Sequence, residues 1–507
     1  MTAVVEQPVQ PSVRAEPGGS WAAVFALAVF ETRRLLTRVP VLVAFLVYVA
    51  WTVWRAERDS DGFPALQDVD RATQAAPMLV GLAILLSVNH AALRSRRHGT
   101  EPHFAVLVLP PWRRTVAHAL SALAAALLVA GCVAAQFGRE ALRPGVIGQG
   151  SVGELLVGPL TVLLFGLFGL LLAGLVRSVL AAPLLVVFFL FLFLFLSGMS
   201  DDGTRWLLPV VAEATSNTFP SDLMGRPAGW HALYLAGLAL SLGLAAVLVT
   251  GGRKPVVMAG VAGAVAMSLV GGVAQAQASD PDPELVRARE RATVHPEQVQ
   301  SCVRRDGSTY CAFPEWGPRV DDWAGVVDQV RSLAGGSAHE QHVVVRQRIE
   351  ARYGLSGDGA LTPLERPHEV TVGTRWGGNR VPEFSAAVAA VLVAGNEKAS
   401  TSMCDGRMVT VMWLALGWES DPVSALRRVR LDDSVTGSAL VLHPADALYM
   451  TDAQTEVLRE LLERPRGEVT ARVKDHWAEL TAPKVTAARA AGLLGVKAPE
   501  GDDKCLD

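Results

Sequence analysis

The chain contains little charge of either sign. Only 19% of its 507 residues are Asp, Glu, Lys or Arg, whereas 50% are hydrophobic and the mean hydropathy is +0.31. These values are too apolar for an ordinary soluble protein, in which about a quarter of the residues are charged. The formal net charge of −3 gives no general basic field, so no nucleic-acid partner is expected.

Several catalytic and nucleotide-binding motifs are also missing. No G-x-x-x-x-G-K-[ST] occurs, so nothing would hold a nucleoside triphosphate as a P-loop does. A zinc pair on a helix needs histidines four residues apart, but at that spacing Val343 follows His339 and Val372 follows His368. No Gly-x-Ser-x-Gly elbow is found either. We therefore expect no catalytic residue, no metal site, no cofactor and no enzymatic activity. A catalytic site assembled from scattered residues of 279–507 stays open as the alternative to a binding, gating or protein-interaction role.

Long apolar runs are concentrated in the first half of the chain. A run of about 18 or more apolar residues can cross a bilayer as a helix. Six runs fit this description: 75–93, 115–136, 155–176, 179–196, 230–250 and 256–277. A seventh run, 39–54, is short but is flanked by Arg38 and Arg55. The sequence therefore predicts an all-α membrane domain with six spans at 39–250 and a seventh span within 251–278.

The distribution of positive charge predicts the orientation of these spans. With the N-terminal residues 1–38 placed in the cytoplasm, twelve Lys and Arg residues lie in the inner segments and seven in the outer loops. We therefore predict a multi-pass protein of the plasma membrane with a cytoplasmic N-terminus. Seven crossings place residues 279–507 outside the cytoplasm.

The segment GGRKPVVMAGVAGAVAMSLVGGVAQAQASD (251–280) looks like a signal peptide in the middle of the chain. Arg253 and Lys254 precede an apolar stretch, and small-x-small patterns end at Ala276 and Ala278. The stretch is longer than the ~7–15-residue apolar core of a signal peptide, which favours an uncleaved anchor. Cleavage after Ala276 or Ala278 remains the alternative.

Four of the five cysteines fall in the region expected outside the cytoplasm. In CVRRDGSTYC (302–311) the central Asp306-Gly307 favours a two-residue hairpin turn, and this register places Cys302 opposite Cys311. We predict a disulfide between them, which suits an oxidising compartment. Cys404 and Cys505 form a second, less specific candidate pair.

Residues 279–507 are predicted to form a mainly helical α+β domain that contains this hairpin. Helices are indicated at 321–336, by apolar residues along one face, and at 451–465, which begins with a Thr451/Gln454 capping box. Strands are indicated at 343–347 and 368–374.

Two segments expected in the cytoplasm combine apolar and basic residues. The stretch 20–38 suits an amphipathic helix in the membrane interface, with Glu31, Arg33 and Arg34 toward water and its large apolar residues toward lipid. These lipid-facing residues are Trp21, Phe25, Val29 and Phe30. The second segment, 93–120, surrounds the apolar stretch 104–109 with five arginines.

These features resemble the ABC-2 type permeases, the membrane subunits of a large exporter family. In that family an interfacial elbow helix precedes six spans, and the loop after span two contains Arg, Gly-Thr-Glu, an apolar stretch, Leu-Pro and paired arginines. The matching residues are Arg97, Gly99, Thr100, Glu101, Leu109, Pro110, Arg113 and Arg114. Pro102 and His103 depart from the family pattern, because they interrupt the helix that usually follows the glutamate.

The resemblance covers about residues 20–250 and extends to RWLLPVV (205–211), which is similar to the re-entrant gate helices of the family. Its gate-like residues are Trp206, Leu207, Leu208 and Pro209. The resemblance implies export of a substrate, a separate ABC ATPase docked on the loop, and a second permease subunit, identical or different. The alternative is an extracytoplasmic receptor or hydrolase-like domain carried on a seven-helix base.

Overall fold

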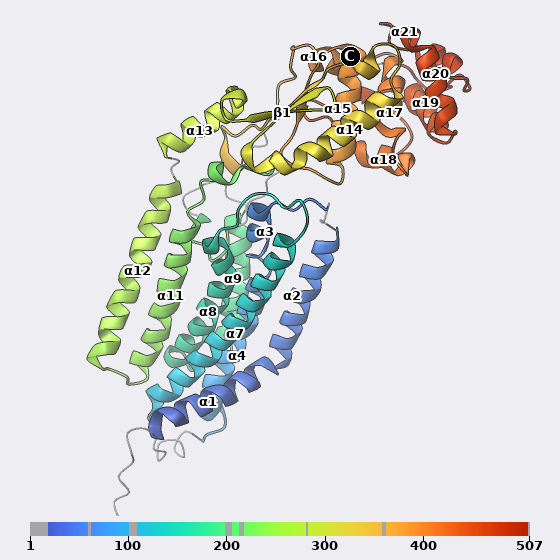
Figure 1. The fold of residues 1–507 in the computed structure, drawn as a ribbon. Helices are drawn as coiled ribbons and strands as arrows, with labels where there is room; N and C mark the ends of the chain where they lie inside the picture. The colour runs from blue at the N-terminus through green and yellow to red at the C-terminus, as the bar shows by residue number, and fades with distance from the viewer. Residues whose placement is uncertain are drawn as a thin grey trace, which may run out of the picture.

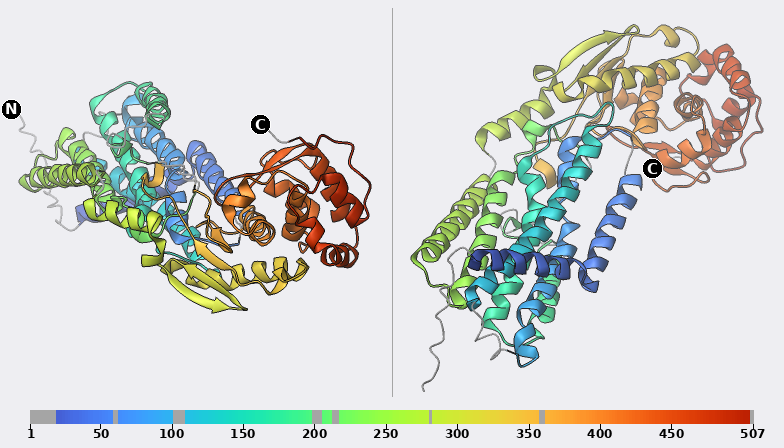
Figure 2. Two further views of the ribbon diagram at one scale, coloured as in Figure 1. Left: turned by 90° about the horizontal axis from the view of Figure 1, so that it is seen from above. Right: turned by 60° about the horizontal axis from the view of Figure 1, so that its bottom comes forward.

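The computed structural model describes residues 19–58, 62–100, 109–197, 205–211, 217–279, 282–356 and 361–504. We call residues 19–279 the helical bundle and residues 282–504 the C-terminal region. The bundle helices run side by side, and the C-terminal region covers one end of them (Figure 1). Seen from above, the C-terminal region extends beyond the bundle on one side (Figure 2).

Six segments of the bundle are long and apolar enough to cross a membrane, and they lie in α2, α3–α4, α7, α8, α11 and α12. Helix α9 is also apolar but has only 17 residues. Length and composition therefore support six of the seven predicted spans. The bounds of the bundle helices are α1 (Gly19–Leu36), α2 (Val39–Arg58), α3 (Leu66–Ala72), α4 (Pro77–Ala92), α5 (Arg94–Arg97), α7 (Pro111–Ala141), α8 (Val152–Leu175), α9 (Ala181–Ser197), η1 (Ser221–Leu223), α11 (Ala228–Val249) and α12 (Pro255–Ser279).

Small residues allow the bundle helices to approach closely. A Cβ atom on Gly169 of α8 would lie 2.4 Å from the carbonyl oxygen of Leu85 in α4. A Cβ atom on Gly237 of α11 would lie 2.5 Å from the backbone nitrogen of Ser268 in α12. Larger residues at these two positions would push the helices apart, as expected where helices pack without a hydrophobic driving force between them.

The C-terminal region combines helices with two small sheets. Its helices are α13 (Pro283–Val294), η2 (Pro296–Gln298), η3 (Pro314–Arg319), α14 (Val320–Leu333), η4 (Ala338–Glu340), η5 (Gly354–Ser356), α15 (Arg380–Ala394), α16 (Glu397–Thr401), α17 (Arg407–Leu416), α18 (Pro422–Val429), α19 (Asp452–Leu462), α20 (Arg466–Asp475), α21 (Trp477–Leu480) and α22 (Ala487–Leu494). Its strands are β1 (Ser301–Arg305), β2 (Ser308–Ala312), β3 (Val344–Gln347), β4 (Glu369–Val372), β5 (Ala439–Val441) and β6 (Leu448–Met450).

The predicted hairpin is confirmed with its register. Strands β1 and β2 are antiparallel, with Cys302 opposite Cys311, and the two cysteines are disulfide-bonded. The turn residues Asp306 and Gly307 both have positive φ, at 45° and 79°, as a two-residue turn of this kind requires. Strands β3 and β4 continue the sheet in parallel, so its order is β1-β2-β3-β4.

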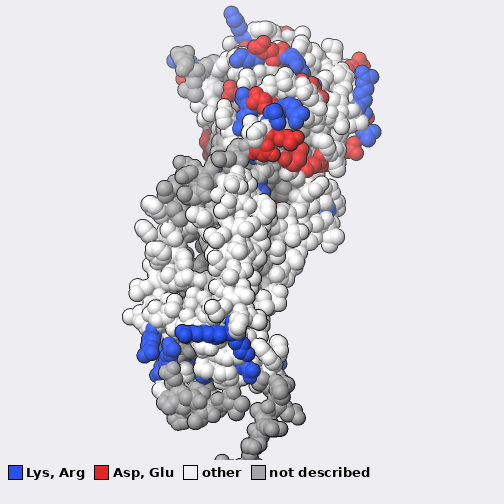
Figure 3. Space-filling model, turned by 90° about the vertical axis from the view of Figure 1, so that its left-hand side faces the viewer, with Lys and Arg blue, Asp and Glu red and all other residues white. Residues whose placement is uncertain are grey.

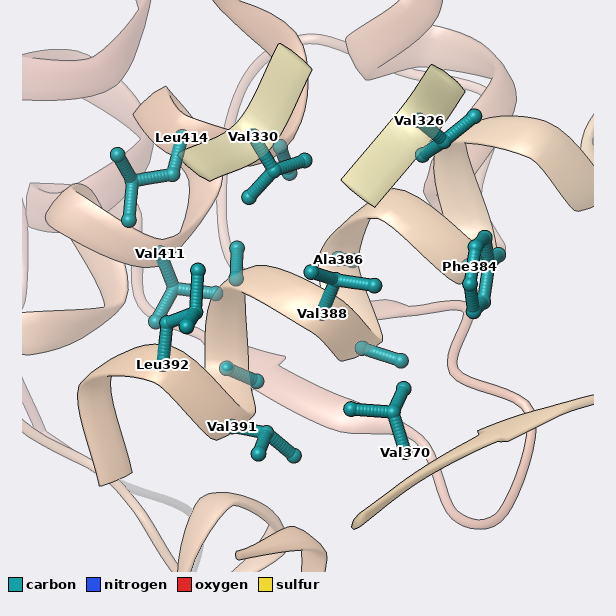
Figure 4. Packing of buried hydrophobic residues seen from close by; sticks show 14 of the residues in the cluster. Val326, Val330, Val370, Phe384, Ala386, Val388, Val391, Leu392, Val411 and Leu414 are labelled. Atoms are coloured by element: carbon teal, nitrogen blue, oxygen red, sulfur yellow. The ribbon is translucent and has the colours of Figure 1, made fainter. Parts of the chain in front are cut away.

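The helices and strands predicted in this region are confirmed as well. Helix α14 buries the predicted face around Trp323, and the capping box of Thr451 and Gln454 begins α19. Cys404 is disulfide-bonded, whereas Cys505 lies outside the described residues. Valine, leucine and alanine side chains of α14, α15 and α17 fill the space between these helices and strand β4 (Figure 4).

One histidine of this region is buried in a form that cannot readily take up a proton. His443 is 7% exposed, and its Nδ1 atom accepts hydrogen bonds from the backbone N–H groups of Ala445 and Asp446. Burial lowers the pKa of His443 to about 4. The unfolded chain, with an ordinary histidine pKa of about 6.5, therefore takes up the proton first when the pH falls.

We predict that this histidine makes the stability of the C-terminal region depend on pH. The contribution of the neutral His443 side chain to the free energy of unfolding is complete above about pH 6.5. It is lost as the pH falls to about 4, which lowers the free energy of unfolding by about 3 kcal/mol. His443→Asn keeps an acceptor near the position of Nδ1 but does not titrate, so it should remove this part of the pH dependence. Urea unfolding of the full chain in detergent, followed by tryptophan fluorescence, measures the effect.

Gln298→Asn supplies the control: the side chain is exposed and has no titratable group, so the pH dependence should match that of the natural chain. Equal pH profiles for the natural chain and His443→Asn would contradict the prediction.

Candidate functional site

Helix α1 lies across the ends of its neighbours and packs on the start of α7 (Figure 2). Val24 and Ala28 of α1 and Ala117 of α7 are buried together. The predicted lipid-facing residues of α1 are all exposed: Trp21, Phe25, Val29 and Phe30. Helix α1 therefore carries an exposed apolar face at this end of the bundle.

The prediction for Glu31 is wrong. Its side chain does not face water with Arg33 and Arg34 but is 3% exposed and accepts a hydrogen bond from the Arg94 guanidinium at 2.5 Å. A buried carboxylate needs such a cationic partner to offset the loss of its hydration. The pattern of α1 alone could not show that Arg94, at the start of α5, would reach it.

The predicted docking loop is held at its first end by a closed turn. Thr100 donates from its backbone N–H and its hydroxyl to the carbonyl oxygen of Ser95, at 3.0 and 3.3 Å. Gly99 has a φ of 63°, a conformation that suits glycine. Arg97 is exposed. Glu101 falls within 101–108, outside the described residues.

The second end of the loop is held against α1. Leu109 packs on the small cluster of Val24 and Ala28, and Pro110 is the extended residue that caps the start of α7. Pro110 thus fixes the point at which the loop enters the helix. Arg114 follows in the first turn and is half-buried.

Aromatic and cationic side chains join three helices at this end. The rings of Trp21 and Trp112 meet edge to face at 6.2 Å, and the Arg113 guanidinium lies 5.6 and 5.1 Å from their centroids. The Lys254 ammonium at the start of α12 lies 4.9 Å from the Trp112 ring. Such contacts are attractive because the ring faces carry partial negative charge.

We call these residues, with Glu31 and Arg94, the α1 corner. Two further arginines fasten it to other helices. Arg38 donates to the carbonyl oxygen of Ser87 in α4 at 2.7 Å, and Arg96 donates to that of Ala173 in α8 at 3.2 Å. A displacement of the loop would therefore be transmitted to several helices of the bundle through these contacts.

The predicted gate-like segment lies at the opposite end of the bundle. Trp206 and Leu208 are buried, whereas Leu207 is 59% exposed. Gln275 of α12 donates to the carbonyl oxygen of Trp206 at 2.9 Å, and Thr161 of α8 donates to that of Pro209 at 3.1 Å. Of the described residues 205–211, Arg205 is helical and 206–210 form turns and bends that are tied to two spans.

A buried ion pair beside this segment was missed by the sequence analysis. Arg226 donates to both oxygens of the Glu154 carboxylate, at 2.6 and 3.3 Å, and each side chain is 4% exposed. Gln74 donates to the same carboxylate, and the Arg226 guanidinium lies 5.0 Å from the Trp206 ring. Glu154 stands directly before an apolar run and Arg226 stands in a loop, so neither position indicated the pair.

A cavity of about 700 Å³ lies between α2, α3, α7 and the C-terminal region. One end is apolar and the other carries charged residues. Its lining from the bundle includes Tyr48, Val49, Trp51, Thr52, Val53, Arg55, Cys132, Arg139, Glu140 and Arg143, and its lining from the C-terminal region is Arg319, Thr374, Arg375 and Trp376. No group of three His, Cys, Asp or Glu residues within the described ranges could hold a metal ion.

The C-terminal region is fixed above this cavity by apolar and polar contacts. Phe63 of the bundle meets the Trp376 ring edge to face at 6.1 Å, and the Arg319 guanidinium lies 4.5 Å from the Phe63 ring. Glu315 accepts from the backbone N–H of Ser221 at 3.2 Å. Burial raises the pKa of Glu315, although the bonds from Ser221 oppose this rise.

The charges of the molecule are unevenly distributed. On the face shown in Figure 3, Lys and Arg gather at the α1 end, acidic and basic residues mix on the C-terminal region, and the surface between them is almost without charge. This pattern agrees with a band of the bundle that faces lipid.

No protein-family model and no curated protein matches this chain. The functional argument therefore depends on the residues and contacts described above.

We predict that breaking the pair of Glu154 and Arg226 destabilises this end of the bundle. Arg226→Met leaves a buried carboxylate without its cation and should lower the free energy of unfolding by about 3–5 kcal/mol. The double variant Glu154→Gln/Arg226→Met removes both charges and should recover much of this loss. Thermal unfolding of the purified chain in detergent measures both effects, with Arg287→Met on the exposed side of α13 as the control. A single variant as stable as the control would contradict the prediction.

Proposed function

We propose that this chain is the membrane-spanning subunit of an ATP-driven exporter of the ABC-2 type, and that a separate subunit hydrolyses ATP. The observation that carries the proposal is the α1 corner. An interfacial helix, both described ends of a basic loop and the starts of α7 and α12 meet there through Glu31–Arg94 and the Trp21–Arg113–Trp112 contacts. Such an arrangement suits a lever, because force applied to the loop is passed to the spans.

The proposed topology has seven crossings in the plasma membrane, with the N-terminus inside and the C-terminal region outside. Helix α9, at 17 residues, is at the short end of the length that can span a bilayer, and its apolar side chains are largely exposed. The Cys302–Cys311 disulfide supports an oxidising compartment for the C-terminal region.

Exporters of this kind alternate between two states, so the spans need a second permease subunit and an external gate. Helices α2 and α9 both expose apolar side chains, and these faces could contact lipid or a partner permease, identical or different. We assign the gate-like role to 206–209, where Leu207 is exposed beside the buried Trp206 and Leu208.

The topology can be tested with fused reporters. A reporter that is active only in the cytoplasm should work at the N-terminus or at residue 100 and should be silent after residue 290, because seven crossings separate the two ends. Reporter activity after residue 290 would contradict both the seventh crossing and the export of the C-terminal region.

The ATPase can be tested through the docking loop. Glu101→Lys reverses the charge that would meet a basic site on the ATPase, so we expect less co-purified ATP hydrolysis with unchanged membrane insertion. The matched control is Glu290→Lys, which makes the same change on the exposed side of α13. Co-purification from detergent followed by measurement of ATP hydrolysis gives the result.

Two outcomes would contradict the proposal. In the first, ATPase binding and stimulated hydrolysis persist after Glu101→Lys is combined with deletion of 104–109. The loop would then be only a connection between helices and not the ATPase-binding segment. Absence of any ATPase from the natural chain would favour the alternative, a receptor or hydrolase-like domain on a seven-helix base.

A further inference from the structure

The cavity between the bundle and the C-terminal region is apolar along its deeper part. Helix α2 lines it from Tyr48 to Ala56, which corresponds to a rise of about 12 Å. Helix α7 lines it with one face, on which Cys132, Ala135 and Gln136 are followed one turn later by Arg139. A ligand that fits this part must offer a hydrocarbon surface.

The end of the cavity nearer the C-terminal region carries an excess of positive charge. Five arginines line it from both parts of the molecule, whereas its described lining contains two carboxylates: Arg55, Arg139, Arg143, Arg319 and Arg375 against Asp68 and Glu140. Arg139 and Arg143 both pair with Glu140, at 3.2 and 3.1 Å, so this single carboxylate faces two cations. An anionic group is favoured at this end, and phosphate is an anion that arginine side chains bind with paired hydrogen bonds.

The cavity communicates with the outer surface of α2. Val49, Trp51 and Val53 line it and are also 39%, 50% and 46% exposed. Helix α2 lies at the edge of the bundle, where its main neighbour is α4 (Figure 1). The wall of the cavity is therefore continuous with the apolar surface that would face lipid.

We infer that this cavity binds an anionic phospholipid, whose phosphate is not neutralised by a cation in the same headgroup. The hydrocarbon chain lies along α2 and α7, and the phosphate lies among the arginines. A volume of about 700 Å³ is within the usual range for ligand sites and holds the headgroup with the first part of the chains. The inference concerns a ligand of the bundle and does not depend on an ATPase.

The test uses the full chain in detergent, without nucleotide. Native mass spectrometry compares retention of phosphatidylglycerol with that of phosphatidylcholine carrying the same chains. We expect one phosphatidylglycerol to be retained about tenfold more tightly, because the choline headgroup brings a cation to the arginines. Arg139→Gln should weaken this binding about tenfold and Arg55→Gln, which removes another charge of the lining, several-fold. Arg304→Gln, on an exposed side chain outside the cavity, is the matched control.

The native thiol of Cys132 reports where the lipid binds. Cys132 lines the cavity and is the free cysteine among those described, so bound phosphatidylglycerol should slow its alkylation by N-ethylmaleimide, measured on the isolated peptide. Lipid retention without slower alkylation would mean binding on the outer surface and would overturn the inference. If glycerol 3-phosphate or inorganic phosphate protected Cys132 from alkylation equally well, the ligand would be a soluble anion and not a lipid.

Equal retention of the two lipids would also overturn the inference. If Arg139→Gln fails to give a folded chain, Arg55→Gln changes an exposed side chain at the end of α2 and removes one positive charge of the lining, so it still decides the outcome.

Discussion

The apolar core that the bundle and the C-terminal region share is the constraint on which the rest of the arrangement depends. Ala65, Ile147, Phe219 and Leu223 come from segments between the spans, yet they belong to the same buried cluster as the tryptophans of the C-terminal region. Burial of this kind is the main favourable term in protein association. The shared core holds the C-terminal region in place over the end of the bundle. Trp376 and Arg319 therefore complete the lining of a cavity whose other walls are helices of the bundle.

Helix α7 connects the two ends at which function is proposed. Its 31 residues correspond to a length of about 46 Å. It begins at Trp112 and Arg113 in the α1 corner and ends with Arg139 at the charged end of the cavity. Because a continuous helix resists compression along its axis, movement at one end can reach the other without a chain of separate side-chain contacts.

Local features were predictable from the sequence and long-range ones were not. The turn at Asp306-Gly307, the register of Cys302 with Cys311 and the Thr451 capping box each follow from a few adjacent residues. Glu31 was misplaced because its partner Arg94 lies on another helix 63 positions away. The Glu154–Arg226 pair and the cavity depend on how spans and loops are brought together, which periodicity and composition do not specify.

The shared core also changes what a break in the chain would mean. Ala276 and Ala278 lie in helix α12, and the neighbouring Gln275 is held by Trp206. Beyond this helix, Arg289 donates to the carbonyl oxygens of Leu223 and Met224 at 2.9 and 2.8 Å, and the shared core lies beyond that. Proteolysis after Ala276 or Ala278 would therefore produce two polypeptides that stay together as a non-covalent complex, rather than a secreted fragment and a membrane remnant.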